Sequence, residues 1–238
     1  RLLTEFYDKR KRGDDATALW ERALAEAPEN LQIRAALARR YESKGKADEA
    51  RALLAEGVET LGTSQAYTEL GEFERRNGRP GEALQAIDEA IQASPKPSEQ
   101  MSFLKADLLV DLGRLEEAEA LVRTLTEAAF RDLIRGRILL ARGDAAGALA
   151  TFDTGLKRWP NNAGARYLAG LAAYQVGDFT RAESEFRESL RVDPAATDAA
   201  LVAGVLAGER RSLAKTITLV ESSRRDHQQR GQSILEKL

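Results

Sequence analysis

Residues 141–162 read ARGDAAGALATFDTGLKRWPNN, and residues 175–196 read QVGDFTRAESEFRESLRVDPAA. At a shift of 34 residues the two stretches share a Gly-Asp pair, an alanine, a phenylalanine and a proline: Gly143-Asp144, Ala148, Phe152 and Pro160 in the first, and Gly177-Asp178, Ala182, Phe186 and Pro194 in the second. Recurrence at a fixed distance of about 20–50 residues is typical of chains built from stacked structural repeats. The two stretches therefore predict a repeat architecture.

The same period runs through most of the chain. Glycines that end one apolar-periodic segment and precede the next are 32, 33, 35, 30 and 34 residues apart, at Gly13, Gly45, Gly78, Gly113, Gly143 and Gly177. Five residues after most of them comes an alanine, then a large apolar residue four positions later and a small residue three positions after that. Pro28, Pro95, Pro160 and Pro194 close four of the units.

These residue types suit pairs of helices joined by short turns. Glycine or alanine at a crossing lets two helices approach at the short end of the usual range of about 8–10 Å between axes. Glycine also takes the positive φ angle that a helix end often needs, and proline ends a helix because it lacks an N–H group. We expect the alanines to lie at helix crossings and the large apolar residue to fill the seam between consecutive units.

This pattern resembles the tetratricopeptide repeat family, whose unit is two antiparallel helices in about 34 residues. Within that family the chain resembles a bacterial scaffold protein. The first half of the family signature is matched by Leu37-Ala38 with Tyr41, Tyr67 with Leu70-Gly71, Ala106, Gly136, Gly170 and Gly204. The resemblance implies an all-α fold, a right-handed α-solenoid of about six repeats plus a C-terminal capping helix. The array covers 1–208, with units over about 1–30, 31–63, 64–98, 99–128, 129–162 and 163–196, the first helix of a seventh at 197–208, and a capping or extension helix at 209–238.

One unit departs from the period. The repeat over 99–128 is about four residues short, it has no closing proline, and Leu125 stands where other units carry a small residue. We expect a shortened second helix and an altered stacking angle near residues 123–130, and not a domain boundary. Ordinary drift in a degenerate repeat is the alternative.

Composition excludes several classes of function. Lys and Arg number 36 against 38 Asp and Glu, a balance that lacks the basic excess typical of nucleic-acid binders. The sequence contains no run of 18 or more apolar residues, so it predicts no membrane-inserted segment. The chain has no cysteine, which excludes disulfides and cysteine-ligated zinc, and its one histidine, His227, has no second histidine for a metal site. We expect no cofactor and no metal.

Nothing in the sequence indicates an enzyme. No glycine-rich phosphate loop occurs, and carboxylate pairs such as Glu116-Glu117 follow the glycines, where they meet the positive end of a helix dipole. The sequence begins at Arg1 and its only methionine is Met101. We take this to mean a removed signal or anchor, or a piece of a longer protein.

In the family that the chain resembles, the first helix of each repeat, together with those of its neighbours, lines a concave groove that binds peptides or partner helices. The first helices here imply a polar half made of Arg39, Glu42, Glu69, Glu72, Arg75 and Arg76. They also imply an apolar half made of Phe103, Leu104, Phe130, Leu133, Ile134, Tyr167, Leu168, Leu171, Tyr174 and Leu201. Large exposed apolar patches usually mark interaction surfaces. The alternative is that these apolar residues belong to the core, or that the chain itself fills the groove.

The sequence therefore predicts a noncatalytic scaffold that binds a partner peptide or helix, in a bacterial cell-envelope export or assembly system. One alternative is the recognition arm of a larger enzyme, such as a transferase; another is a self-associating repeat protein that forms homo-oligomers. The identity of the protein partner stays open, as does the choice between periplasm or cell envelope and cytoplasm.

Overall fold

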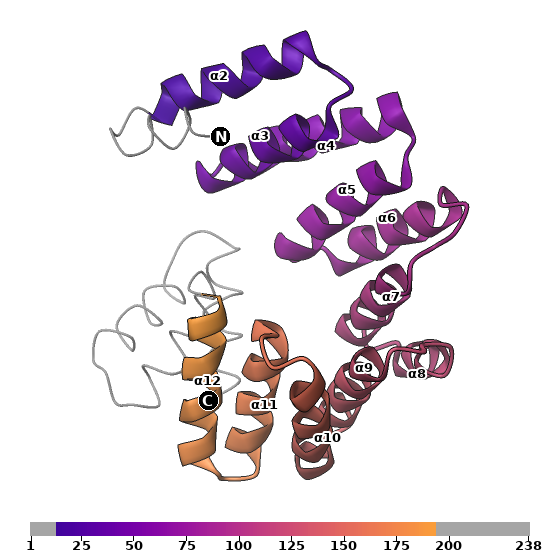
Figure 1. Ribbon diagram of the computed structural model, residues 1–238, viewed down its shortest axis with the longest axis vertical. Helices are drawn as coiled ribbons and strands as arrows, with labels where there is room; N and C mark the ends of the chain where they lie inside the picture. The colour runs from indigo at the N-terminus through magenta and orange to yellow at the C-terminus, as the bar shows by residue number, and fades with distance from the viewer. Residues whose placement is uncertain (1–12, 194–238) are drawn as a thin grey trace. The chain divides into compact units, whose positions relative to one another are not determined.

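The computed structural model describes residues 13–193, which form eleven α-helices and no strand (Figure 1). The chain divides into two compact units, Arg1–Leu112 and Gly113–Leu238. The described helices of the first unit are α2 (Gly13–Glu26), α3 (Leu31–Ser43), α4 (Ala47–Leu61), α5 (Ser64–Arg76), α6 (Pro80–Gln92) and α7 (Glu99–Asp111). Those of the second are α8 (Leu115–Val122), α9 (Ala128–Ala141), α10 (Ala145–Arg158), α11 (Ala163–Gln175) and α12 (Phe179–Val192). The predicted all-α class is confirmed.

Helices that follow one another in sequence pack as antiparallel pairs. In the first unit α3 pairs with α4 and α5 with α6, and in the second α9 pairs with α10 and α11 with α12 (Figure 1). These four pairs correspond to the predicted units 31–63, 64–98, 129–162 and 163–196, except that α9 begins one residue earlier, at Ala128. The predicted seventh repeat at 197–208 and the cap at 209–238 lie outside the described residues, as does His227.

The repeated Gly-Asp pair is the turn between two paired helices. Gly143 and Gly177 both have φ of 84°, in the left-handed region where a β-carbon is penalised. The next residue is the N-cap of the second helix: Asp144 accepts a hydrogen bond from the backbone N–H of Gly147 at 2.9 Å. Asp178 accepts one from that of Arg181 at 3.0 Å. Glycine thus ends one helix and aspartate begins the next.

A bulky side chain of the second helix lies directly on a glycine of the first helix. A β-carbon added to Gly136 would lie 2.6 Å from the Phe152 ring, and one added to Gly170 would lie 2.7 Å from the Phe186 ring. Both rings are fully buried. The large residue was expected between consecutive units, but these two rings lie within their own helix pair. The correction has a steric cause: the missing side chain of glycine leaves a space that the ring fills.

The predicted crossing residues are fully covered. The alanines of the second helices have no exposed surface, at Ala50, Ala83, Ala118, Ala148 and Ala182. Leu54 does contribute to packing between pairs, because it shares a buried cluster with Phe73 of the following pair. The packing therefore combines contacts within each pair and contacts between neighbouring pairs.

In three repeats, a buried or half-buried arginine of the first helix forms a hydrogen bond with the segment that precedes that helix. It is the fourth residue of its helix, and its guanidinium donates a hydrogen bond to the carbonyl six residues earlier: Arg34 to Pro28 at 3.1 Å, Arg131 to Leu125 at 2.9 Å and Arg166 to Pro160 at 3.2 Å. Arg34 is 1% exposed, and it also donates to the Leu53 carbonyl at 2.9 Å. Its side chain occupies the space beside Gly57, where an added β-carbon would lie 2.5 Å from Arg34 Cδ.

The short repeat contains a short second helix, as predicted. Helix α8 has 8 residues, against 14 in α10. Leu125, which follows the helix, is 3% exposed and so belongs to the core. The stacking angle expected near residues 123–130 stays a prediction.

Replacement of Gly136 with alanine should destabilise the protein by about 1–3 kcal/mol, because the buried Phe152 ring must move away from the new methyl group. Gly81→Ala is the matched control, since nothing lies within 4 Å of an added β-carbon there, and helix propensity alone would leave stability unchanged or raise it by up to about 1 kcal/mol. Denaturant unfolding of both variants measures the difference. Equal stability would contradict the glycine–ring contact.

Replacement of Arg34 with methionine should lower the free energy of unfolding by about 1–3 kcal/mol, since it removes charge-assisted hydrogen bonds at a buried position while keeping the aliphatic stem. Arg76→Ala serves as the control. Its partner is Glu42 at 3.2 Å and its side chain is largely exposed, so its loss should cost no more than about 1 kcal/mol. Similar losses for the two variants would refute the role given to Arg34.

Candidate partner-binding surfaces

Ion pairs link consecutive first helices in the first unit. Arg39 on α3 lies 3.1 Å from a carboxylate oxygen of Glu69 on α5. Arg76 on α5 reaches back to Glu42 on α3, at 3.2 Å. The sequence analysis placed all four residues in the polar half of a groove, and the structure brings them together in two pairs across the same two helices.

The row of ion pairs continues onto α7. Arg75 of α5 hydrogen-bonds to Asp107, and its Nε lies 3.8 Å from a carboxylate oxygen of Asp111. Asp107 is only 5% exposed. The sequence analysis omitted both aspartates, although α7 is the next first helix and Asp107 follows the small residue Ala106 immediately. Glu72, the remaining predicted residue, is exposed on α5.

Most of the named charges on the face formed by α3, α5 and α7 are paired: its three arginines contact four of its five carboxylates, and the named residues carry a net charge of −2. Exposed ion pairs contribute about 0–1 kcal/mol each, so they organise side chains more than they stabilise the fold. A partner that docks here must match an arrangement of charges that is already paired. The polar face therefore favours recognition by shape and hydrogen bonding over simple charge attraction.

Three of the predicted apolar groove residues are core residues. Leu133, Ile134 and Leu171 are 4%, 0% and 7% exposed. Leu133 faces the second helix of its pair, where its Cδ2 lies 3.0 Å from the position of a β-carbon on Gly155. This corrects the expectation that these residues offer surface to a partner: they pack between helices, which is the alternative that the sequence left open.

The other predicted apolar residues are half-buried, except Leu201, which lies outside the described residues. Phe103 and Leu104 are half-buried on α7 in the first unit. In the second unit the same holds for Phe130, Tyr167, Leu168 and Tyr174. Two of these rings have aromatic neighbours: Phe130 lies 5.8 Å from Trp159, and Tyr167 lies 5.6 Å from Phe186, between ring centroids. Intramolecular packing therefore covers part of each ring.

The most exposed large apolar side chains in residues 13–193 lie where α11 turns into α12. Phe179 is 59% exposed and Val176 is 44% exposed. The Phe179 ring lies edge-on to Tyr174, with 5.4 Å between ring centroids. We call Tyr174, Val176 and Phe179 the apolar corner. Tyr174 also packs against the buried cluster that contains Leu171, which connects the corner to the core of the second unit.

Sequence reasoning missed Val176 and Phe179 because it searched only the first helices. A signal was available at Phe179, which begins its second helix. The same position carries Ala47 in α4, Pro80 in α6, Leu115 in α8 and Ala145 in α10. Among these five helix starts only Phe179 is aromatic, a difference that the sequence alone displays.

The resolved pKa shifts among the described residues arise from contacts between helices. Burial, together with the hydrogen bond that its hydroxyl donates to Glu21 at 2.8 Å, raises the pKa of Tyr41 to about 12. A hydrogen bond from Lys44 lowers the pKa of Asp14, and a hydrogen bond to Asp153 raises the pKa of Arg181. These pairs join separate helices and do not converge on a cleft. Their role is therefore structural in this part of the chain.

Residues 13–193 contain no group of three or more His, Cys, Asp or Glu side chains placed to hold a metal ion. None of their helices combines the length and the apolar character required to cross a membrane.

Comparison with known proteins supports the repeat assignment. Two family models, both described as tetratricopeptide repeat, match this chain, one at residues 9–71 and 74–142 and the other at 133–188 and 167–222. No curated protein matches it. A tetratricopeptide repeat protein from Parabacteroides merdae is similar in structure, with a TM-score of 0.64, 12% identity, and coverage of 98% of this chain and 95% of that one.

Two more solved structures are similar in fold. A thermophilic TPR protein from Thermus thermophilus gives a TM-score of 0.55 at 20% identity, covering 73% of this chain and 99% of that one. The APC/C hetero-tetramer Cut9–Hcn1 gives 0.60 at 11% identity, covering 98% of this chain and 48% of that one. These identities bear on the fold alone. Together with the family matches over most of its length, they show that the chain belongs to the tetratricopeptide repeat family, whose members are generally noncatalytic scaffolds that bind other proteins.

Proposed function

We propose that this protein is a noncatalytic scaffold that binds an apolar peptide or helix of a partner protein at the apolar corner of α11 and α12. The observation that carries the proposal is the exposure of Phe179, at 59%, beside the half-exposed Val176. Burying a large apolar side chain contributes about 1.5–3 kcal/mol, so two such residues provide a useful share of a binding energy. The general character of the family supports the noncatalytic role.

The corner is more than a single exposed ring. Tyr174 joins Phe179 to the buried cluster around Leu171, and half-buried Leu140 and Tyr167 pack against that same cluster. The apolar corner is therefore continuous with the core of the second unit. Hot spots of protein interfaces are enriched in Tyr and Trp, and Tyr174 is such a residue.

This surface suits a partner segment with apolar residues on one side. An amphipathic helix presents such residues at positions i, i+3, i+4 and i+7, and it can lay them along a neighbouring pair of helices. The cell-envelope export or assembly setting is part of the proposal, and it rests on the resemblance to tetratricopeptide repeat arrays of such systems.

Replacement of Phe179 with aspartate should abolish partner capture without loss of stability, because the ring is exposed and a carboxylate at a helix start is favourable. The matched control is Thr180→Asp, which places the same charge on the next exposed residue. We expect the Phe179 variant to recover at least tenfold less of the main partner from native lysate by quantitative mass spectrometry. Purified partner then confirms the difference by calorimetry.

Equal capture by both variants would remove the apolar corner from consideration. Sedimentation of the wild type over a range of concentrations tests the homo-oligomer alternative. If the wild type self-associates and Phe179→Asp does not, the corner joins copies of this chain and the proposed partner is a second copy.

A further inference from the structure

A cavity of about 250 Å³ lies between α8, α9 and α10 in the second unit, and none of its lining residues belongs to the apolar corner. Its apolar floor includes Val122 of α8 and Ile138 of α9, which are 1% and 3% exposed. Its rim carries three arginines, Arg123, Arg135 and Arg142, and one glutamate, Glu119. The site thus combines an apolar floor with a rim of net positive charge.

Two features of the chain border the cavity. The first is the short α8, which ends at Val122. The second is Arg135, the residue that precedes the small crossing residue Gly136. The same position carries the buried Leu37 in α3 and the half-buried Lys105 in α7, whereas Arg135 is exposed. The cavity therefore lies beside a shortened helix and an exposed arginine.

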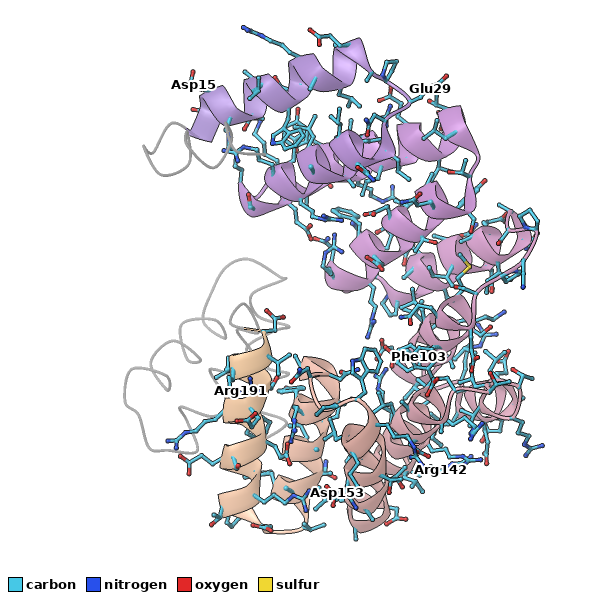
Figure 2. The ribbon with its side chains drawn as sticks, viewed as in Figure 1. Asp15, Glu29, Phe103, Arg142, Asp153 and Arg191 are labelled. Atoms are coloured by element: carbon cyan, nitrogen blue, oxygen red, sulfur yellow. The ribbon has the colours of Figure 1, made fainter. Side chains whose placement is uncertain are left out.

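Two of the three arginines at the rim are not paired with an acidic residue among the described residues. Arg142, labelled in Figure 2, lies 2.9 Å from Glu119 and 3.8 Å from Glu116 on α8, so acidic neighbours balance its charge. Arg123 and Arg135 are both exposed, and neither has an ion pair or side-chain hydrogen bond with another described residue. Two guanidinium groups at the mouth of an apolar cavity are therefore available to an anionic ligand.

We propose that this cavity is a second binding site, which takes an acidic segment of a partner protein. An aliphatic side chain of that segment fills the cavity, and the carboxylates beside it pair with Arg123 and Arg135. Guanidinium groups bind carboxylates through two parallel hydrogen bonds, which gives such a site direction as well as charge. The proposal rests on the role of the chain as a protein-binding scaffold, but it uses a different surface from the apolar corner.

The size of the cavity favours a side chain over a free small molecule. Clefts that bury drug-sized ligands usually measure about 300–1,000 Å³, and this cavity lies below that range. One branched aliphatic side chain fits such a volume, with its backbone and neighbouring carboxylates outside at the rim. The arginines lie at that rim, one after α8 and the other within α9.

A peptide array tests the site directly. The probes are twelve-residue Gly/Ser peptides that carry one leucine and two glutamates at every relative spacing, each beside a matched peptide with two glutamines. We expect the purified full chain to bind a subset of the glutamate peptides and to bind their glutamine partners at least tenfold less tightly in fluorescence anisotropy. If no glutamate peptide binds better than its glutamine partner, the proposal is wrong.

Variants of the chain then locate the binding. Arg123→Gln with Arg135→Gln should weaken the best peptide at least tenfold, and Arg22→Gln, which removes an exposed arginine of α2, should leave its affinity unchanged. Thr151→Leu on α10 should also weaken binding, because the larger side chain takes up part of the cavity and keeps every arginine. Equal weakening by Arg22→Gln, or full binding by the double variant, would overturn the site in favour of general charge attraction.

The outcome is separable from that for the apolar corner. Phe179→Asp should leave the affinity for the acidic peptide unchanged, since Phe179 does not line the cavity. The two exposed arginines have no partner to lose among the described residues, so the double variant should melt at the wild-type temperature. If Thr151→Leu lowers the melting temperature, the arginine variants alone decide the proposal.

Discussion

The fold depends on the close approach of paired helices at residues that have no side chain. Phe152 on Gly136 and Phe186 on Gly170 show the same arrangement, with a ring of the second helix against the backbone of the first. A ring held in this way fixes how far apart two helices lie and how far one can slide along the other. The turn glycines and the aspartate caps then have only to reverse the chain. Local contacts of this kind explain why each helix pair can be described by its own residues and those of its neighbours.

Sequence periodicity predicted the helix pairs, the turn glycines and the short α8, because each depends on residues near one another in the chain. Periodicity was less successful in predicting which apolar residues are exposed. Leu133, Ile134 and Leu171 are core residues, although the first helices were expected to present them to a partner. A step of one residue rotates a side chain by about 100° around a helix axis, so a small error in the assigned face exchanges core and surface. The period alone does not define that face.

Sequence reasoning missed the apolar corner and the cavity for different reasons. The corner lies in a turn between helices, and a search along first helices passes over Val176 and Phe179. The cavity lies between three helices, and its lining is not defined until those helices are placed side by side. Four of the six residues predicted for the polar half form the ion pairs that link α3 to α5, and their role in binding a partner stays a prediction.

The length of α8 has a consequence for how such an array can change. The unit that contains it is shorter than its neighbours by about four residues, and an α-helix makes one turn in 3.6 residues. The shortening falls after Val122, at the end of α8, so Ala118 and Val122 precede it and keep their fully buried places. The loss of about one turn at the end of a helix therefore changes the surface beside that helix and leaves the buried residues before it in place.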